Sequence, residues 1–177
     1  MQVKAQIMNA ESMIRVIGRI SHEIAERNDG VKDVVILGIK RRGVPLAKGI
    51  CKNIFSFENV TVPMGELDIT NQRDDLTEEQ KKAKVTESVI PCDINGKTVI
   101  IVDDVLYTGR TVKAALETVF QYGRPKCVQF VVLIDRGHRE LPIRPDYIGK
   151  NVPTSKTESI SVRFNEIDGE TGVYIVE

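Results

Sequence analysis

The stretch Val99–Leu116, VIIVDDVLYTGRTVKAAL, decides the fold. It opens with an unbroken apolar run, typical of a buried strand, made of Val99, Ile100, Ile101 and Val102. Asp103 and Asp104 follow directly, and after them comes the short polar turn Tyr107–Thr111. Apolar residues at helical spacing then begin, so the stretch predicts a strand, a tight turn and a helix.

The predicted turn has the properties of an anion site. Its backbone N–H groups have no internal partner, and the helix N-terminus adds about half a positive charge. Thr108 and Thr111 supply hydroxyl donors, so one phosphate monoester fits there. Asp103 and Asp104 would repel a phosphate but suit sugar hydroxyls or Mg²⁺. The stretch therefore indicates a ligand with a phosphate at one end of a diol, such as ribose 5-phosphate.

The same stretch, VIIVDDVLYTGRT, resembles the phosphoribosyl-pyrophosphate motif of type I phosphoribosyltransferases. The alternative is a strand–helix turn whose acids only cap the helix. The resemblance implies that Asp103 and Asp104 are catalytic and hold Mg²⁺, directly or through water. It assigns phosphoribosyl pyrophosphate to the whole run of Val99, Ile100, Ile101, Val102, Asp103, Asp104, Val105, Leu106, Tyr107, Thr108, Gly109, Arg110 and Thr111.

Length and composition limit the remaining possibilities. A chain of 177 residues is expected to form one domain, 1–177. The 25 basic and 25 acidic residues balance, which excludes a uniformly basic protein but not a local basic face. Cys51, Cys92 and Cys127 are widely spaced, so we expect reduced thiols in a cytoplasmic protein. No apolar run reaches membrane length, and we expect no membrane partner.

The N-terminal part predicts an extended arm followed by an amphipathic helix, Glu11–Arg27. Asp33–Gly38 predicts the first core strand, and helical spacing resumes over Val44–Phe55. The turn between them carries three consecutive cations between glycines. It is either an ordinary basic surface loop or a site for a second, more highly charged anion. In the phosphoribosyltransferase reading it is the pyrophosphate loop, formed by Lys40, Arg41, Arg42 and Gly43.

The middle of the chain contains a polar excursion. Asn59–Ile69 alternates like a strand, with a break expected at Pro63–Gly65. Charged residues then dominate from Thr70 to about Thr86, which is either a solvated loop without a role or a mobile catalytic loop, about 70–90. Type I enzymes close such a loop over the reacting centre. Arg73 is the residue expected to reach the pyrophosphate.

Strands alternate with helices along the chain, and Cys127–Ile134 predicts another buried strand. This alternation predicts an α/β protein with a twisted, mostly parallel sheet flanked by helices. The resemblance implies the type I phosphoribosyltransferase fold, with a small hood formed mainly by residues 135–177 and the N-terminal arm. It also implies a uracil pocket at Asp135, Arg136, Tyr147 and Ile148. Tyr147 offers an aromatic face for a base, or it is a plain core aromatic.

Longer motifs narrow the resemblance to the PyrR family. They are HEIAERN, GELDIT, VDDVLYTGRTV and DRGHRELPIRPDYIGKNVPTSK. The family implies a UMP-dependent attenuator of pyrimidine biosynthesis genes that binds a leader mRNA stem-loop. It also implies uracil phosphoribosyltransferase activity, and a homodimer or homotetramer. The basic face attributed to RNA binding matches Arg19, His22, Arg27, His138, Arg139, Arg144 and Lys150. Gly18 departs from the hydroxyl residue that family members often carry there.

Two other functions stay open at this stage. One is a phosphoribosyltransferase for some nucleobase without an RNA role. The other is an RNA-binding regulator that has lost catalysis and uses the nucleotide site only as a sensor.

Overall fold

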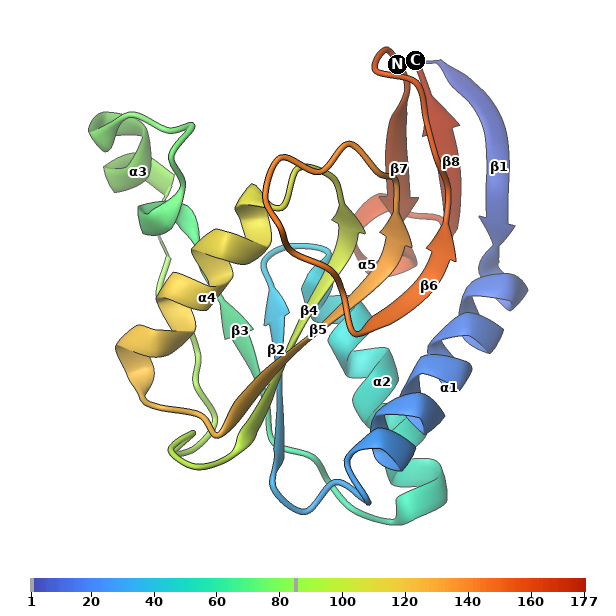
Figure 1. Ribbon diagram of the computed structural model, residues 1–177. Helices are drawn as coiled ribbons and strands as arrows, with labels where there is room; N and C mark the ends of the chain where they lie inside the picture. Colours follow the sequence, from blue (N-terminus) through green and yellow to red (C-terminus); the bar gives the residue numbers. More distant parts are fainter. Residues whose placement is uncertain (1, 85) are drawn as a thin grey trace.

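A five-stranded parallel sheet forms the centre of the computed structural model, which describes residues 2–84 and 86–177 (Figure 1). Its strand order is β3-β2-β4-β5-β6. The strands are β2 Val34–Ile39, β3 Met64–Leu67, β4 Thr98–Leu106, β5 Cys127–Asp135 and β6 Tyr147–Asn151. The expected twisted parallel sheet flanked by helices is therefore confirmed.

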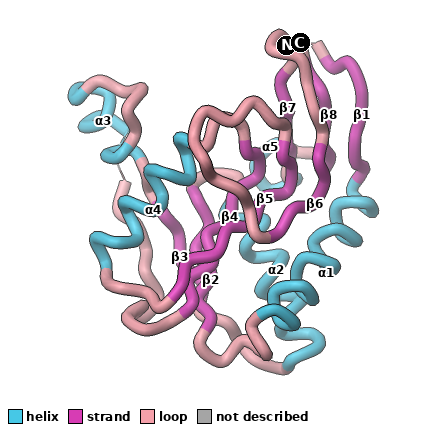
Figure 2. Tube along the Cα trace, in the orientation of Figure 1, coloured by secondary structure: helices cyan, strands magenta, loops and turns pink. Residues whose placement is uncertain are grey.

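Helices cover the two faces of this sheet (Figure 2). On one face lie α1 Ala10–Arg27 and α2 Gly43–Glu58, and α4 Arg110–Tyr122 lies on the other. Successive residues of β2 point to opposite faces: Ile36 packs with α1 and α2, while Val35 and Leu37 pack with α4. Burial on both faces explains why β2 and β4 are continuous apolar runs.

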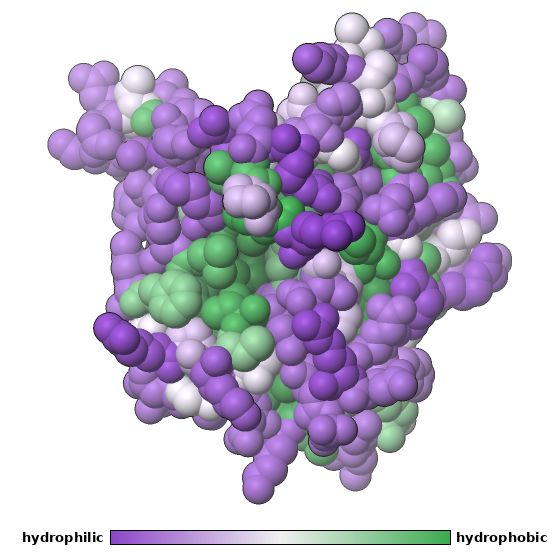
Figure 3. Space-filling model, viewed as in Figure 1, coloured by the Kyte–Doolittle hydropathy of each residue, from purple (hydrophilic) through white to green (hydrophobic). Residues whose placement is uncertain are grey.

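The α4 face is less completely covered than the α1 face. The connection between β5 and β6, residues 136–146, contains no helix. Figure 3 shows a largely hydrophilic surface in which hydrophobic side chains gather beside α4. No helix in the described part of the chain is long and apolar enough to cross a membrane.

A second, three-stranded antiparallel sheet joins the two ends of the chain. Its order is β1-β8-β7, with β1 Val3–Asn9, β7 Ser159–Arg163 and β8 Gly172–Val176. The expected N-terminal arm is thus the edge strand of this sheet, and the two termini lie together (Figure 1). The short helix α5, Asn165–Asp168, connects β7 to β8.

Two predicted boundaries were wrong. The expected break at Pro63–Gly65 lies partly inside β3, because Met64 and Gly65 pair with β2. A Cβ on Gly65 would meet the Val89 carbonyl oxygen at 2.1 Å, so glycine here permits close packing instead of a turn. The central strand was also expected to end before the acids, but β4 continues to Leu106 because β5 pairs with it that far.

The polar excursion after β3 contains two short helices. They are the 3₁₀ turn η1, Thr70–Gln72, and α3, Glu78–Lys84, which projects away from the sheet (Figure 1). The expected mobile loop also includes Val85, which lies outside the described residues.

Candidate active site

The candidate site is a pocket of about 560 Å³ at the carboxyl ends of β2, β3 and β4. Ligands of open parallel sheets bind at this edge. The pocket is lined by the loop after β2, by the segment after β3 and by the end of β4 with the start of α4. The residues include Lys40–Arg42, Asp68–Thr70, Arg73, Thr86, Asp103–Val105 and Thr111. The structure therefore brings together the predicted acids, the cationic loop, Arg73 and one end of the phosphate turn.

Asp103 and Asp104 lie at the end of β4, and their carboxylates are fixed by backbone. Asp103 Oδ1 accepts a hydrogen bond from the Asp104 N–H at 2.9 Å, and Asp104 Oδ1 accepts one from the Val105 N–H at 2.9 Å. Burial raises the pKa of Asp103 well above its usual range, and the neighbouring Asp104 charge raises it further. Burial also raises the pKa of Asp104, although the Arg42 charge opposes this. Cationic or hydroxyl partners would therefore stabilise the ionised form of this pair of carboxylates.

The predicted phosphate turn connects β4 to α4. Gly109 is the N-cap of α4 with φ 97°, a left-handed conformation that glycine adopts without strain. Arg110 and Thr111 belong to the first turn of the helix, where backbone N–H groups lack intrahelical acceptors. The loop after β5 holds the turn, because the Glu140 and Leu141 N–H groups donate to the Thr108 carbonyl at 2.9 and 3.2 Å.

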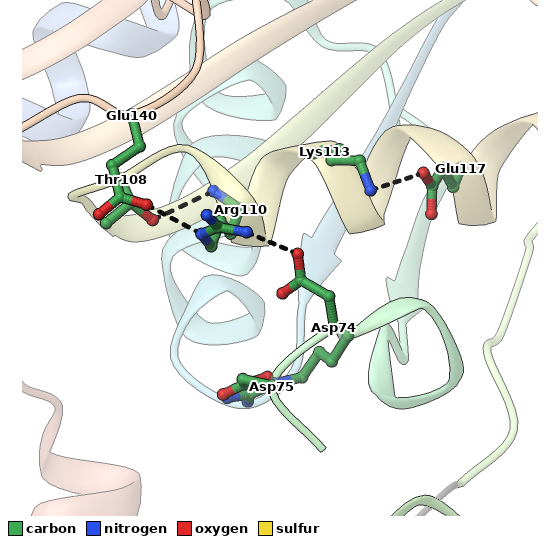
Figure 4. A network of polar contacts seen from close by, with 8 residues as sticks. Asp74, Asp75, Thr108, Arg110, Lys113, Glu117 and Glu140 are labelled. Carbon is green, nitrogen blue, oxygen red and sulfur yellow. Dashed lines mark hydrogen bonds and ion pairs between the residues drawn. The ribbon is translucent and has the colours of Figure 1, made fainter. Parts of the chain in front are cut away.

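Arg110 links this turn to two other loops (Figure 4). Its Nη1 lies 2.7 Å from Asp74 Oδ2 in the polar excursion, and its Nε lies 3.0 Å from Glu140 Oε2. The Arg110 side chain is half exposed, at 50%. Its guanidinium therefore pairs with two carboxylates, and a phosphate on the turn would meet backbone and hydroxyl donors first.

The three cations of the predicted pyrophosphate loop have different surroundings. Lys40 Nζ donates to the Thr86 hydroxyl at 3.1 Å and to the Glu87 carbonyl at 2.8 Å. Arg42 Nη2 lies 2.7 Å from Asp168 Oδ1 in α5, while its buried Nε has no hydrogen-bond partner in the described part of the chain. Arg41 is exposed. The loop thus contains one buried donor, Arg42 Nε, that no described protein atom accepts.

Gly43 allows this loop to lie directly on the central strand. A Cβ at this position would meet the Val102 carbonyl oxygen at 2.3 Å, so no other residue fits without a shift of backbone. The close approach brings the cations of the loop next to Asp103 and Asp104.

Asp68 closes the neck of the polar excursion. Its carboxylate accepts hydrogen bonds from the Thr70 N–H at 2.7 Å and the Thr86 N–H at 2.8 Å, and also from the Thr86 hydroxyl. Hydrogen bonds from both threonines lower the pKa of Asp68 despite its partial burial. Within the excursion, Arg73 lines the pocket while it pairs with Asp75 through its Nε at 2.8 Å.

Sequence reasoning missed Asp68, Asp74 and Asp168. Asp68 lies in the motif GELDIT, which assigned it no role, and Asp74 and Asp168 lie in none of the motifs named above. Each of the three acts through a partner that is distant along the chain: Thr86, Arg110 and Arg42 respectively. Only the fold reveals these pairs. The acidic composition of the excursion was the one available signal for Asp74.

The structure places the four predicted uracil-pocket residues outside the lining of this pocket. Asp135 is paired with Arg139 at 2.7 and 2.6 Å, and this pair lowers the pKa of Asp135. Arg136 is buried: its guanidinium carbon lies 4.0 Å from the centre of the Tyr107 ring, and its Nε donates to the Thr154 hydroxyl at 3.0 Å. Both residues fix the loop after β5.

Tyr147 and Ile148 belong to β6, where Tyr147 is buried and Ile148 partly buried. The Tyr147 hydroxyl donates to Gln129 Oε1 at 2.6 Å, and Asn28 Nδ2 lies 3.2 Å from the same hydroxyl. The ring is 3% exposed and packs on the α1 side, whereas Ile148 packs toward the α4 side. Of the two alternatives for Tyr147, the structure supports a core aromatic residue and not an aromatic face for a base.

The predicted RNA-binding residues divide into two groups. Those on α1 and β6 are Arg19, His22, Arg27 and Lys150, and those on the loop after β5 are His138, Arg139 and Arg144. Arg19 Nη2 donates to the carbonyls of Ile148 and Gly149 at 3.2 and 2.7 Å, which joins α1 to β6. Arg27 pairs with Asp146 at 2.9 Å, and His138 Nε2 lies 2.6 Å from the Thr154 carbonyl oxygen.

Most of these cations therefore also have structural partners. In the described ranges, Arg144 and Lys150 are exposed, and their side chains make neither a hydrogen bond nor an ion pair. They are the members of the two groups whose charges are most available to a ligand.

Comparisons with known proteins identify relatives of this chain. The model of the phosphoribosyl transferase domain matches residues 4–166. A protein from Pelotomaculum thermopropionicum, named "Bifunctional protein PyrR", is 55% identical over 174 residues, covering 98% of this chain and 96% of that protein. A protein of the same name from Thermus thermophilus is 51% identical over 177 residues, covering 100% of this chain and 98% of its own length.

Solved structures match the fold at lower identity. A hypoxanthine phosphoribosyltransferase from Trypanosoma cruzi has a TM-score of 0.75 and 20% identity, covering 99% of this chain and 96% of its own. A hypoxanthine-guanine phosphoribosyltransferase from Bacillus anthracis has a TM-score of 0.73 and 19% identity, covering 99% of both chains. At this identity the likeness establishes the fold alone.

Proposed function

Because this chain belongs to the PyrR family of phosphoribosyltransferases, we propose that it converts uracil and phosphoribosyl pyrophosphate to UMP and pyrophosphate. We further propose that it binds a leader mRNA stem-loop when UMP is bound, and so attenuates transcription of pyrimidine biosynthesis genes in the cytoplasm. The observation that carries the catalytic part is the single pocket in which the β4 acids face the cationic loop.

Each part of phosphoribosyl pyrophosphate has a matching part of the proposed site. The 5-phosphate would lie on the turn before α4, held by first-turn amides and by the hydroxyls of Thr108 and Thr111. The ribose hydroxyls would donate to Asp103 and Asp104. The pyrophosphate would lie against Lys40–Arg42, where the unpartnered Nε of Arg42 gains an acceptor.

The donor set fits Mg²⁺. The described residues contain no group of three or more His, Cys, Asp or Glu side chains that could hold a metal. Mg²⁺ commonly takes one or two carboxylates and completes its shell with water and substrate phosphates, which the Asp103–Asp104 pair allows. When bound there, the ion would supply positive charge to the leaving pyrophosphate.

The protein's own contribution is separation of charge. Breaking the bond between C1 and the pyrophosphate oxygen builds positive charge on the ribose and negative charge on the leaving group. Asp103 and Asp104 stabilise the first, and Lys40–Arg42 stabilise the second, in a fixed arrangement that needs little reorganisation. Uracil N1 then attacks the opposite face of the ribose, and its proton leaves to water. The excursion after β3 would close over the site, hold pyrophosphate through Arg73 and exclude water.

The chain would act as a single domain of residues 1–177, with a hood formed by the antiparallel sheet and the loop after β5. The four residues predicted to bind uracil have structural partners, so we propose that Asp135 and Arg136 fix the hood loop after β5 while Tyr147 and Ile148 support β6. A homodimer or homotetramer remains part of the proposal.

Two measurements test the proposal. The first is product formation from phosphoribosyl pyrophosphate with uracil, hypoxanthine, guanine or adenine. We expect nucleotide from uracil alone, and a loss of about 100-fold in the nearly isosteric Asp104→Asn variant. Turnover of a purine base in place of uracil would indicate a different transferase.

The second measurement is binding of a leader stem-loop at fixed salt, with and without UMP, because phosphate contacts make affinity depend on salt. We expect tighter binding with UMP. Equal and weak binding in both conditions would leave a transferase without the RNA function, and Gly18 would be the first position to test by substitution.

A further inference from the structure

We propose that the stacked rings of His22 and Phe57 form a platform for one unpaired RNA base, a base whose edge carries N–H donors. The inference rests on the proposed RNA-binding function and adds to it a site and a class of base. Phe57 belongs to α2 and to none of the motifs that suggested RNA binding.

The platform is an exposed aromatic pair between two helices. His22 lies on α1 and Phe57 in the last turn of α2, with ring centroids 4.0 Å apart and planes 16° from parallel. Both side chains reach the surface, and Phe57 is 36% exposed. RNA-binding proteins stack unpaired bases on such rings, a contact worth about 1–3 kcal/mol per base.

The rim of the platform favours a base over a phosphate. The rings line an open pocket of about 470 Å³, and three carboxylates, Glu26, Asp29 and Glu58, surround it. None of these carboxylates has a side-chain hydrogen bond or an ion pair with any other described residue. Carboxylates accept hydrogen bonds and repel phosphate, so they suit the amino and imino donors of guanine or the amino groups of cytosine and adenine. Uracil, with one N–H between two carbonyls, fits less well.

The platform lies within reach of cations that could hold the RNA backbone. Arg15 and Arg19 share the exposed stripe of α1 with His22, and the side chain of Arg15 is 71% exposed. Each pairs with a glutamate of the same helix, Arg15 with Glu11 at 3.9 Å and Arg19 with Glu23 at 2.7 Å, so Arg15 is the more available of the two. At a rise of about 1.5 Å per residue, Arg19 lies about 4.5 Å and Arg15 about 10 Å from His22 along the helix axis. A strand with phosphates over these arginines could place its next base on the rings.

The test uses RNA hairpins with one common stem and randomised loops, selected on the wild-type protein in the presence of UMP. The affinity of a selected hairpin is then measured against salt for four variants. Phe57→Leu removes the π face and keeps an apolar side chain, while Phe57→Tyr retains the π face. Phe55→Leu is the matched control, because Phe55 is exposed on the same helix at 51%. Lys150→Gln removes a free cation.

We expect Phe57→Leu to weaken binding about 5- to 150-fold without changing the salt dependence. It should also abolish the preference for one base at one loop position. Phe57→Tyr and Phe55→Leu should bind like the wild type, and Lys150→Gln should instead lower the salt slope by about 1.

The possible failures are distinguishable. If selection returns no hairpin, the proposed RNA function is wrong and the platform with it. If a hairpin is selected but Phe57→Leu binds within twofold of the wild type, the platform is wrong and the RNA function stands. Equal losses in Phe57→Leu and Phe57→Tyr would also overturn the platform, because they would show a packing role in place of stacking.

Discussion

Two carboxylates at the same edge of the sheet should respond to neutralisation in opposite directions. Asp103 and Asp135 are almost equally buried, at 8% and 7% exposed. Burial beside Asp104 raises the pKa of Asp103, whereas the Arg139 guanidinium lowers the pKa of Asp135. The charge on Asp103 therefore opposes folding at neutral pH, and the charge on Asp135 favours it.

The magnitudes follow from the contacts. Asp103→Asn keeps the acceptor for the Asp104 N–H and removes a buried like charge, so we expect a gain of about 1 kcal/mol in unfolding free energy. For a chain of this size that raises Tm by about 2–4 °C. Asp135→Asn removes the negative charge that accepts two hydrogen bonds from the Arg139 guanidinium. We therefore expect a loss of about 2 kcal/mol in unfolding free energy and a Tm lower by about 4–8 °C.

The pH dependence of stability provides a second test of the opposite signs expected for Asp103→Asn and Asp135→Asn. The folded protein binds a proton at Asp103 more tightly than the unfolded chain does, so the gain in Asp103→Asn should grow as pH rises through the folded-state pKa. Well below the ordinary Asp pKa of about 3.9, where the wild-type Asp103 is protonated in both states, the gain should vanish. The loss of unfolding free energy in Asp135→Asn should be complete above the ordinary Asp pKa. It should shrink as the pH falls through the lowered pKa of folded-state Asp135.

Calorimetry or thermal unfolding of both variants from about pH 2 to pH 8 measures these shifts, because both effects should fade only below the ordinary Asp pKa. Uracil turnover is measured in parallel at neutral pH. Asp103→Asn should be more stable and about 100-fold less active at neutral pH. A fall in Tm for Asp103→Asn, or Tm shifts of the same sign in both variants at neutral pH, would refute the electrostatic reasoning.

Three further predictions test the packing around the site. Gly43→Ala should cost about 1–3 kcal/mol and displace the cationic loop, because the new Cβ would lie 2.3 Å from the Val102 carbonyl; thermal unfolding and the KM for phosphoribosyl pyrophosphate measure both. Tyr147→Phe should cost about 1 kcal/mol through loss of its bond to Gln129 and leave the KM for uracil unchanged. Asp68→Asn should speed proteolysis within residues 70–84 with little change in Tm, because the neck loses one of the two carboxylate oxygens that accept backbone N–H groups while the core is untouched.

The fold was predictable because its signals are local and repeated. The apolar runs of β2, β4 and β5 are continuous, as expected of strands buried on both faces, and the helical spacing of α1 and α4 is regular. The pocket was predictable for a related reason. In a parallel sheet the carboxyl ends of adjacent strands meet, so the cations after β2 and the acids of β4 had to be neighbours.

The roles of hood residues were less predictable, since they depend on which side of a short strand faces the core. Tyr147 follows an irregular, proline-containing stretch, so no periodicity assigns its direction. In the fold it points toward Asn28 and Gln129, two polar residues that are far away along the chain and satisfy its hydroxyl. A base-binding tyrosine and a core tyrosine are identical in sequence, and only the partners distinguish them.

The same reasoning applies to cations. A guanidinium that is already bonded must give up those bonds before it can bind a ligand, so its net gain is smaller than that of a free one. Arg19 holds α1 to β6, and its loss would alter the geometry of the basic face as well as its charge. Lys150, which is exposed and makes no ion pair within the described residues, can be neutralised without breaking a protein contact. A selective loss of RNA affinity in Lys150→Gln would therefore identify phosphate contact, whereas the same loss in Arg19→Gln would not separate binding from folding.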